Sequence, residues 1–362
     1  MSVVESESRL RALRRRLRWE ALYVSAPPNI RYLTGFSGSA GHLLVRRDEA
    51  TLITDGRYRT QARLQTSGIA VEISAGDSRI ALAEAVGARG LKELGFEANR
   101  LSYDAYAFLR REAVGCSLVP ADSPVEALRI LKSEDEVRAI RRSVDLNSNV
   151  FDEVCRRLEP GWTESRLAAE LEFGMRRLGA EGPAFPTIVA GGPHGALPHA
   201  EPRDAAIPRN TLVVVDQGAV VGGYCSDMTR MIAVGRPDSA QMELVEAVRE
   251  AQAAAVGAIR AGVECRTVDG RARQALRKRT VGGVRLDTAF THSTGHGVGL
   301  EIHEGPRIAA RRRQRLRAGM VVTVEPGAYL EGLAGVRIED VVVVTEDGCE
   351  ILTRTPRELR IL

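Results

Sequence analysis

Residues 211–234, TLVVVDQGAVVGGYCSDMTRMIAV, decide the fold of the second half of the chain. Two β-branched, apolar runs flank a glycine-containing turn, which is the pattern of a β-hairpin. If the turn centres on Val221 and Gly222, Asp216 lies directly opposite Asp227. A turn one residue later makes the two aspartates diagonal neighbours on the same face. Either register brings two carboxylates together.

Two like charges at this spacing destabilise a sheet unless something compensates them. Directly opposed side chains have Cβ atoms roughly 4.5–5.5 Å apart, and burial of an unpaired carboxylate is costly. Asp216 ends an apolar run, residues 211–215, where burial is expected. The alternative is that one aspartate caps a solvent-exposed turn. The apolar run favours a bound cation as the compensation.

Histidines gather in the same half of the chain, because five of the six lie between residues 194 and 303. The stretch 292–306, HSTGHGVGLEIHEGP, is rich in glycine and holds three of them. They are His292, His296 and His303. Their spacing differs from the two-histidine helix of an HExxH zinc site, and the glycines argue against a helix. We interpret His42 and His194 as structural histidines.

A third segment, residues 321–344, VVTVEPGAYLEGLAGVRIEDVVVV, adds two glutamates. Glu325 ends one expected strand, and Glu339 lies inside the next, where it shares a face with Arg337. Four carboxylates therefore join one or more imidazoles. Two divalent cations match their charge, and the oxygen-rich set favours Mn²⁺ over a single tetrahedral Zn²⁺. Two metals roughly 3.5–4 Å apart form a hydrolytic centre.

The sequence pattern of the first part of the chain predicts a small α/β domain. Short β-branched or apolar runs alternate with Gly/Pro/Ser clusters and with helical stretches such as Asp104 to Arg111. The expected strands are residues 21–25, 42–46, 50–54, 69–73 and 94–97. A break over 119–124, VPADSP, separates this domain, residues 1–124, from a second domain, residues 125–362.

The sequence of the second domain predicts several helices and several strands that are rich in β-branched residues. Ser133 and Glu136 form a capping box that opens a long helix, which Pro160 stops. Further helices are expected from Thr163 and over about 239–261. The expected strands are residues 211–219, 224–234, 320–324 and 335–344. We expect an α+β fold in which helices cover one face of a largely antiparallel sheet.

Composition excludes several classes of protein. The 362 residues carry a formal net charge of only +4, so no nucleic-acid partner is implied, and the arginine runs 14–16 and 311–313 are interpreted as solvated faces. The five cysteines are scattered and form no CxxC pair, which fits a reducing cytoplasm. We expect no signal peptide and no membrane partner, since no apolar run approaches ~20 residues.

The order of these motifs resembles the pita-bread metallopeptidases of family M24, in the proline dipeptidase (prolidase) and aminopeptidase P branch. The matching motifs are DQGA, SDMTR, TGHGVGLEIHE, VEPG and GVRIED. Two further stretches, NIRYLTGFSGSAGHLLV and ATLITDGRYRTQA, are similar to the creatinase-like N-terminal domain of the same enzymes. The resemblance implies a creatinase-like α/β domain followed by a pita-bread catalytic domain.

The resemblance also implies a set of five metal ligands for two divalent ions per subunit. It makes Asp216 a ligand of one metal, Asp227 and Glu339 bridges between both, and His296 with Glu325 the ligands of the other. Glu325 is also the implied general base. Mn²⁺ is the expected metal, with Co²⁺ or Zn²⁺ as alternatives.

Five more residues receive roles from the resemblance. His199, in ALPHAEP, and His303 match histidines that contact the scissile carbonyl and stabilise its developing charge. His292 matches a further pocket histidine. Tyr329 and Arg337 match positions that orient the bridging carboxylates and the substrate.

The implied activity is hydrolysis of the Xaa-Pro bond, and the implied assembly is a homodimer. We expect a proline dipeptidase, with an aminopeptidase P acting on longer Xaa-Pro peptides as the alternative. A metal-free, creatinase-like hydrolase and a non-catalytic scaffold are more distant alternatives, against which the presence of every ligand position argues. Gln217 departs from the family pattern, but it points to the opposite face from Asp216 and concerns local packing.

Overall fold

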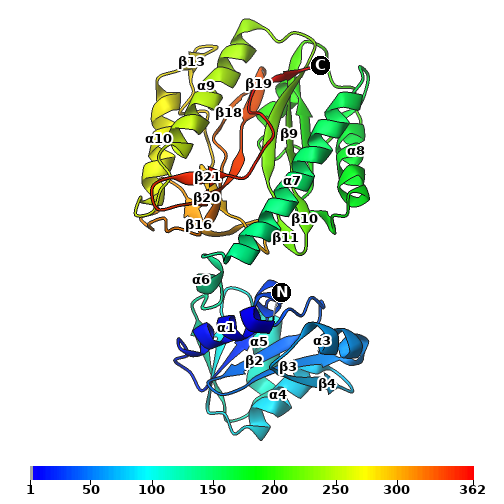
Figure 1. The fold of residues 1–362 in the computed structure, drawn as a ribbon, viewed down its shortest axis with the longest axis vertical. Coiled ribbons are helices and arrows are strands. Elements are labelled where there is room, and N and C mark those ends of the chain that lie inside the picture. The colour runs from blue at the N-terminus through cyan, green and yellow to red at the C-terminus, as the bar shows by residue number, and fades with distance from the viewer. Residues whose placement is uncertain (1–2) are drawn as a thin grey trace. The chain divides into compact units, whose positions relative to one another are not determined.

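The computed structural model describes residues 3–362. Contacts divide the chain into one compact unit up to Arg129 and another from Ile130 (Figure 1). The short helix α6 (Glu126–Arg129) goes with the first unit, because the Arg129 guanidinium donates to Asn29 Oδ1 at 2.7 Å. The domain boundary after residue 124 remains a prediction.

The first unit is built on a six-stranded sheet in the order β4-β3-β2-β1-β5-β6. Its strands are β1 (Ala21–Val24), β2 (His42–Arg46), β3 (Ala50–Asp55), β4 (Ala70–Ser74), β5 (Glu93–Glu97) and β6 (Ser117–Ala121). The pairs β1–β2 and β2–β3 are antiparallel and the other three are parallel. Its longer helices are α1 (Val3–Arg14), α2 (Pro27–Thr34), α3 (Arg59–Gln65), α4 (Ser78–Ala88) and α5 (Tyr103–Glu112). The five expected strands are confirmed, whereas β6 overlaps the expected break.

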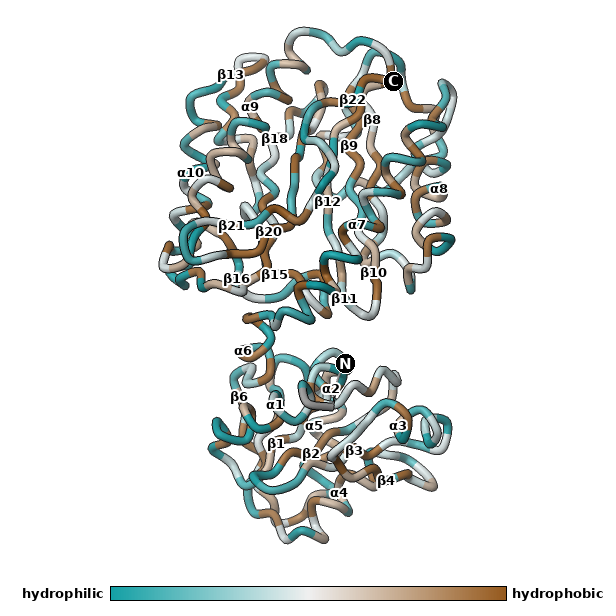
Figure 2. The backbone as a smooth tube through the Cα atoms, viewed as in Figure 1, coloured by the Kyte–Doolittle hydropathy of each residue, from teal (hydrophilic) through white to brown (hydrophobic). Residues whose placement is uncertain are grey.

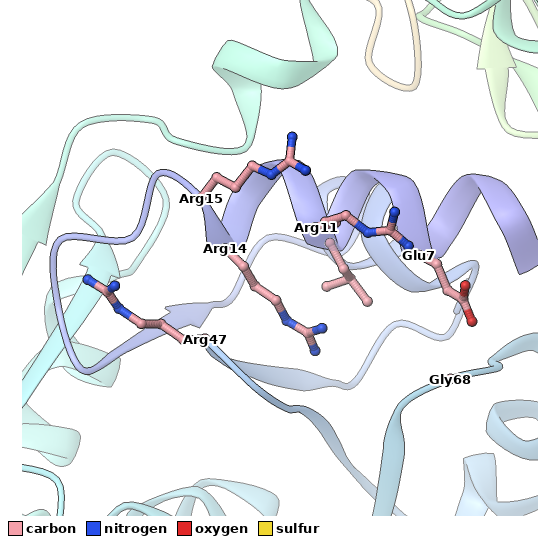
Figure 3. A pocket seen from close by; sticks show the side chains of 7 residues that line it. Glu7, Arg11, Arg14, Arg15, Arg47 and Gly68 are labelled. Atoms are coloured by element: carbon pink, nitrogen blue, oxygen red, sulfur yellow. The ribbon is translucent and has the colours of Figure 1, made fainter.

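The arginine run at the end of α1 borders a hollow of about 440 Å³ in the first unit. Its lining residues are Glu7, Leu10, Arg11, Arg14, Arg15, Arg47 and Gly68. Figure 3 shows the four guanidinium groups pointing in different directions instead of converging on one point. Among the described residues that line the hollow, the guanidinium groups thus do not converge on a common anion position.

The second unit has four long helices, and all but the last begin at a side-chain cap. They are α7 (Glu134–Arg157), α8 (Glu164–Arg177), α9 (Ser239–Val256) and α10 (Cys265–Arg277). Ser133 makes the expected capping box with Glu136, and Thr163 caps α8. Helix α9 ends at Val256, before the expected Ala261, and Gly257 follows it as the C-cap. Beyond it the backbone N–H of Ala261 donates to Thr345 O at the edge of the neighbouring sheet. Helix α10 is not among the helices expected from the sequence.

The strands of the second unit form two main sheets. The first, in the order β22-β12-β9-β8, contains β8 (Ile188–Gly191), β9 (Thr211–Gln217), β12 (Met228–Val234) and β22 (Arg360–Ile361). The second, in the order β16-β15-β17-β20-β21, contains β15 (Gly295–Gly297), β16 (Glu304–Ile308), β17 (Val321–Val324), β20 (Asp340–Val344) and β21 (Cys349–Ile351). Smaller sheets contain β7 (Gly182–Pro183), β10 (Ala219–Val221), β11 (Tyr224–Cys225), β13 (Thr280–Val281), β14 (Val284–Arg285), β18 (Gly327–Leu330) and β19 (Ala334–Arg337). Nearly every pair is antiparallel, as expected; β12 with β22 is parallel.

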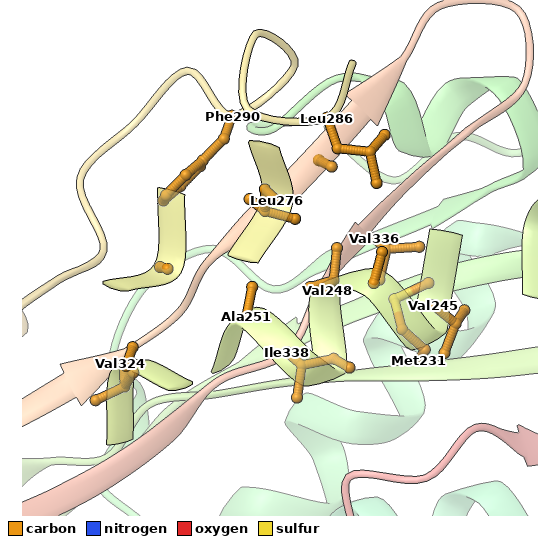
Figure 4. Close-up of a cluster of buried hydrophobic side chains, with 14 of the residues drawn as sticks. Met231, Val245, Val248, Ala251, Leu276, Leu286, Phe290, Val324, Val336 and Ile338 are labelled. Atoms are coloured by element: carbon orange, nitrogen blue, oxygen red, sulfur yellow. The ribbon is translucent and has the colours of Figure 1, made fainter. Parts of the chain in front are cut away.

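Helices cover both faces of the β9–β12 ribbon, so the expectation of one covered face is wrong. Val213 and Val215 pack into a core with α7 and α8, whereas Leu212 and Val214 pack into a core with α9 and α10. The second core, drawn in Figure 4, joins Met231 of β12 to the helices and to the second sheet. A strand buried on both faces needs a continuous apolar run, and Figure 2 shows β9 as largely hydrophobic.

Two further properties of the described residues concern membrane spans and disulfide bonds. Within residues 3–362, no helix combines the length and the apolar character that a membrane span requires. All five cysteines carry free thiols. Apolar cores and hydrogen bonds hold the described part of the second unit together.

Candidate metal centre

The hairpin with the two aspartates turns at Gly222 and Gly223, so the first expected register is wrong and the second is confirmed. Asp216 of β9 pairs with Thr229 of β12. Both turn glycines have positive φ, 59° and 80°, as a type I′ turn requires and as a β-branched residue disfavours. Asp227 therefore lies diagonally from Asp216 on the same face of the ribbon.

The two glutamates come from the second sheet and its continuation. Glu325 directly follows β17, as expected. The sequence predicts one strand over 335–344, but the structure breaks it between β19 and β20, and Glu339 lies at the break. The break has a physical reason, because β19 pairs with β18 whereas β20 pairs with β17. Glu339 is 1% exposed and Arg337 is 4% exposed, and both side chains reach the hairpin.

His296 lies on β15, held between two backbone segments. A Cβ atom on Gly295 would come within 2.0 Å of Thr323 O, and one on Gly297 within 2.1 Å of Gly305 O. Only glycine fits at either position. The glycines that argue against a helix here serve to bring β16 and β17 close around His296.

The structure brings the five predicted ligands to one place. His296 Nε2 lies 3.5 Å from Asp227 Oδ2 and 3.5 Å from Glu325 Oε1. Asp227, His296 and Glu339 each offer a ligand atom within 4.8 Å of the others. Asp216 lines the same cavity as these four. The carboxylates and the imidazole therefore face a common space.

Two carboxylate oxygens of this cluster are buried without a hydrogen-bond partner among the described residues. They are Asp216 Oδ1 and Glu339 Oε1. The second oxygen of each is satisfied, since Arg337 donates to Asp216 Oδ2 at 2.6 Å and Thr229 Oγ1 donates to Glu339 Oε2 at 2.8 Å. A buried unsatisfied oxygen is costly. Oxygens turned toward a shared space in this way fit divalent cations.

The pKa shifts of the clustered carboxylates also indicate a bound cation. Burial, followed by the charges of its acidic neighbours, raises the pKa of Asp227 well above its ordinary value, and the same causes raise the pKa of Glu339. Burial raises the pKa of Glu325 to about 8, although the cation of Arg337 opposes this shift. One arginine cannot neutralise four carboxylates. A bound cation would keep them ionised.

The metal-free protein is expected to lose stability as the pH rises, because Glu325 binds its proton more tightly when folded. Its pKa rises from 4.5 to about 8 on folding, so the free energy of unfolding falls across that interval. Glu325→Gln removes this titration. In EDTA-treated protein we expect the variant to gain on the order of 1–3 kcal/mol over the wild type between pH 5 and about 8, measured by urea unfolding. Parallel pH profiles for the two proteins would contradict this expectation.

The imidazole of His296 is suited to metal binding. Its Nδ1 lies 3.0 Å from Gly297 O, a pure acceptor, so Nδ1 carries the hydrogen and Nε2 presents its lone pair to the carboxylates. Burial lowers the pKa of His296 to about 4. The ring is therefore neutral at pH 7, as a metal ligand must be.

A cavity of about 740 Å³ opens beside the cluster. The predicted histidines His199, His292 and His303 all line it, and the His303 ring centroid lies 4.4 Å from that of His296. Apolar residues form another part of the wall. These are Phe185, Pro186, Ile188, Pro198, Ala200, Pro202 and Ile302. A cavity of this size with a few convergent polar groups is typical of a small-ligand site.

Tyr329 and Arg337 form a hydrogen-bonded chain behind the cluster. His292 Nδ1 faces Ser293 O at 2.9 Å and is therefore protonated, so Nε2 accepts from the Tyr329 hydroxyl at 2.8 Å. That hydroxyl accepts from the Arg337 guanidinium at 2.7 Å. Arg337 also contacts Asp216 and Thr229, which fixes the orientation of the first aspartate.

Several residues that the sequence motifs contain, but that are not among the predicted site residues, support the cluster. Thr229 donates to Glu339, and the buried Arg230 donates to the backbone oxygens of Glu339 and Thr229 and pairs with Asp340 at 2.6 Å. The SDMTR and RIED motifs contain all of these residues, so the signal was present. Arg307, which lines the cavity, lies just beyond the histidine-rich stretch.

The two histidines interpreted as structural have structural partners. His42 lies between the Tyr23 hydroxyl, at 2.7 Å, and Ser78 Oγ, at 3.1 Å, in the first unit. His194 Nδ1 contacts the carboxylate of Glu164 at 3.0 Å. Gln217, the departure from the family pattern, exchanges hydrogen bonds with the backbone and side chain of Asn147 on α7, on the opposite face from Asp216.

Comparison with known proteins identifies relatives over nearly the whole chain. The structure of an Xaa-Pro dipeptidase from Bacillus anthracis superposes with a TM-score of 0.93 at 37% identity, and the match covers 100% of both chains. An X-Pro aminopeptidase from Thermotoga maritima superposes with a TM-score of 0.89 at 36% identity, over 97% of this chain and 99% of its own. The Xaa-Pro dipeptidase of Pyrococcus furiosus is 36% identical over 94% of this chain and 95% of its own length.

Two family descriptions match adjacent parts of the sequence. Residues 8–131 match the creatinase/prolidase N-terminal domain, and residues 138–346, more than half of the chain, match metallopeptidase family M24. The second match contains all five clustered ligand candidates. The chain therefore belongs to metallopeptidase family M24 and carries the creatinase/prolidase N-terminal domain.

Proposed function

We propose that this chain is a proline dipeptidase, which hydrolyses the Xaa-Pro bond of dipeptides. The observation that carries the proposal is the buried acidic cluster at the wall of a cavity of about 740 Å³. The similarity to the Xaa-Pro dipeptidases of Pyrococcus furiosus and Bacillus anthracis supports the choice of substrate. The Xaa-Pro bond lacks an N–H group and its proline ring is rigid, which calls for a dedicated site.

In this proposal the cluster holds two divalent ions, with Mn²⁺ preferred and Co²⁺ or Zn²⁺ as alternatives. Asp216 would hold one ion, His296 and Glu325 would hold the other, and Asp227 and Glu339 would be shared between them. The unpartnered oxygens of Asp216 and Glu339 and the free Nε2 of His296 support this assignment. When bound, such ions lower the pKa of a water molecule and polarise a carbonyl group.

The remaining residues of the cavity position the peptide and move protons. Glu325 accepts a proton from the attacking water, for which its position beside His296 is suited. His199 and His303 donate to the scissile carbonyl oxygen as negative charge develops there. His292 orients the Tyr329 hydroxyl, and Arg337 holds Asp216.

Hydrolysis of Ala-Pro, Ala-Pro-Ala and Ala-Ala by Mn²⁺-loaded protein tests the proposal. A proline dipeptidase cleaves Ala-Pro and leaves Ala-Ala intact. Cleavage chiefly of Ala-Pro-Ala would instead identify an aminopeptidase P, the activity named for the Thermotoga maritima relative. No cleavage of either proline peptide would reject the proposal and favour a non-catalytic or creatinase-like role.

Arg307 is expected to bind the carboxylate of the dipeptide. Its guanidinium lines the cavity and reaches Ser293 Oγ at 3.4 Å, and its charge lowers the pKa of His303, after the effect of burial. Arg307→Met should raise KM for Ala-Pro about 10- to 100-fold, the usual strength of a charge-assisted hydrogen bond. Steady-state kinetics with Ala-Pro and with Ala-Pro amide measure this effect.

The amide and a second arginine supply the controls. Ala-Pro amide has no carboxylate, so its KM should change less than threefold in Arg307→Met. Arg311→Met removes an exposed arginine that does not line the cavity and should leave both substrates unaffected. Equal losses for the acid and the amide would show that Arg307 does not read the carboxylate.

We also propose that the protein acts in the cytoplasm as a homodimer. The free state of all five cysteines supports a reducing compartment. The resemblance to the prolidases supports the dimer. Light scattering coupled to size-exclusion chromatography measures the assembly, and a monomer mass would reject it.

A further inference from the structure

One buried carboxylate outside the metal cluster accepts hydrogen bonds from several backbone and side-chain groups. Glu164, the first residue of α8, has a side chain that is 1% exposed. It accepts from the backbone N–H of Gly191 at 2.9 Å and from that of Arg203 at 3.0 Å. The Arg203 guanidinium donates to both of its oxygens at 3.0 Å, and His194 Nδ1 lies 3.0 Å away. Glu164 thus joins both ends of the segment 191–203.

The segment 191–203 carries one wall of the cavity. Its residues from Pro198 to Pro202, including His199, line that wall. Ser165 Oγ donates to Pro202 O at 3.1 Å next to Glu164, and Arg337 donates to Pro198 O at 3.2 Å from the cluster side. The backbone of His199 is therefore held between two anchors.

The ring of His199 has no comparable support of its own. No residue in the described range 3–362 makes a side-chain hydrogen bond to it, in contrast to His292 and His296, whose rings face backbone oxygens. The position of the His199 imidazole consequently depends on where its backbone lies. The contacts that hold the backbone of segment 191–203 therefore also set the position of His199.

We propose that Glu164 is a positioning residue for His199, holding its segment at the distance at which the imidazole reaches the scissile carbonyl. The role of His199 in this sentence rests on the proposed function. Burial opposes ionisation of Glu164, but the hydrogen bonds from Arg203 and Gly191 outweigh it and lower its pKa, so the carboxylate is charged at neutral pH. An ionised carboxylate accepts from every one of these donors, whereas a glutamine amide turns two hydrogens toward them.

Glu164→Gln in the Mn²⁺-loaded enzyme tests the inference. The variant keeps the size of the side chain but should lower kcat/KM for Ala-Pro about 10- to 100-fold, since a displacement of about 1 Å in a catalytic group costs up to 10²-fold. The metal content should stay unchanged, because Glu164 touches none of the proposed ligands. Loss of metal would overturn the inference.

The decisive measurement is a double-mutant cycle with His199→Ala. If Glu164 acts through His199, then Glu164→Gln should change the rate of His199→Ala less than about twofold. Losses that multiply in the double variant would show a general structural role and overturn the inference. Arg203→Met, whose side chain is 51% exposed, removes the guanidinium bonds without burying a polar group and should show the same dependence on His199 with a smaller loss.

Glu97→Gln is the matched control. Glu97 is also a buried carboxylate with backbone donors, Ser25 N at 2.7 Å and Ala26 N at 2.9 Å, but it lies in the first unit. Any fall in kcat/KM that Glu97→Gln causes should be the same in the wild-type and in the His199→Ala background. A loss that vanished in the His199→Ala background would show that the cycle does not isolate positioning.

Hydrogen exchange separates this inference from the proposed function. In Glu164→Gln the amides of residues 191–203 should exchange at least tenfold faster than in the wild type, while those of β9 stay protected. This result supports the anchoring even if the wild type fails to cleave Ala-Pro, in which case only the proposed function is rejected. Unchanged exchange over 191–203 would overturn the anchoring itself.

Discussion

Glu339→Ala is expected to lower the turnover of Ala-Pro by at least about 10³-fold and to remove bound metal. Glu339 is 1% exposed, one of its oxygens is held by Thr229, and the other is buried without a partner. If this oxygen bridges two ions, both lose a ligand together, and a metal centre contributes several kcal/mol of transition-state stabilisation. Metal content by elemental analysis and kcat on Ala-Pro measure the effect.

The control is Glu331→Ala, which removes an exposed glutamate from the turn between β18 and β19. It should retain the metal and the rate of the wild type. Two bound metals and normal turnover in Glu339→Ala would show that the bridging assignment is wrong. Retention of one metal with low activity would place Glu339 on a single ion.

His303→Ala should lower kcat on Ala-Pro by about 10²-fold while the metal content stays unchanged. The ring lines the cavity and stands edge-on to His296 at 4.4 Å, so it is close to the cluster without being one of its candidate ligands. Removal of a single donor to a developing oxyanion costs 10²–10³-fold in other enzymes. Burial lowers the pKa of His303, so the neutral imidazole is the form that donates at pH 7.

His42→Asn serves as the control for loss of an imidazole, because His42 lies in the first unit, between Tyr23 and Ser78. Its kcat should match the wild type even if its melting temperature falls. An unchanged kcat in His303→Ala would remove His303 from the charge-stabilising role. A loss of metal would reassign it to the cluster.

The sequence predicts which residues form the candidate site better than it predicts the register and the ends of the strands that carry them. Side-chain chemistry and alternation along strands place Asp216, Asp227 and Glu325 where the structure has them. The hairpin register depends on which two residues can adopt positive φ, and the adjacent Gly222 and Gly223 are the residues that do so.

Features that depend on tertiary pairing could not be read from the sequence. The stretch 335–344 looks like one strand because it is uniformly β-forming, and only the competition between β18 and β17 for partners breaks it before Asp340. Likewise, the residues that follow α9 pair with another part of the fold, since the Ala261 N–H donates to Thr345 O. The anchoring by Glu164 joins residues far apart in the chain, for which no local pattern exists.

The buried Arg230 links the segment around Thr355 to the surroundings of the candidate metal centre. Its guanidinium donates to the backbone oxygens of Thr355 and Pro356 as well as to Glu339 O, and β22 pairs with β12. Proteolytic cleavage that removed Thr355 and Pro356 would leave this buried cation without two of its acceptors, directly beside Glu339. Such clipping is therefore expected to disturb the cluster, although this segment supplies none of the five candidate ligands.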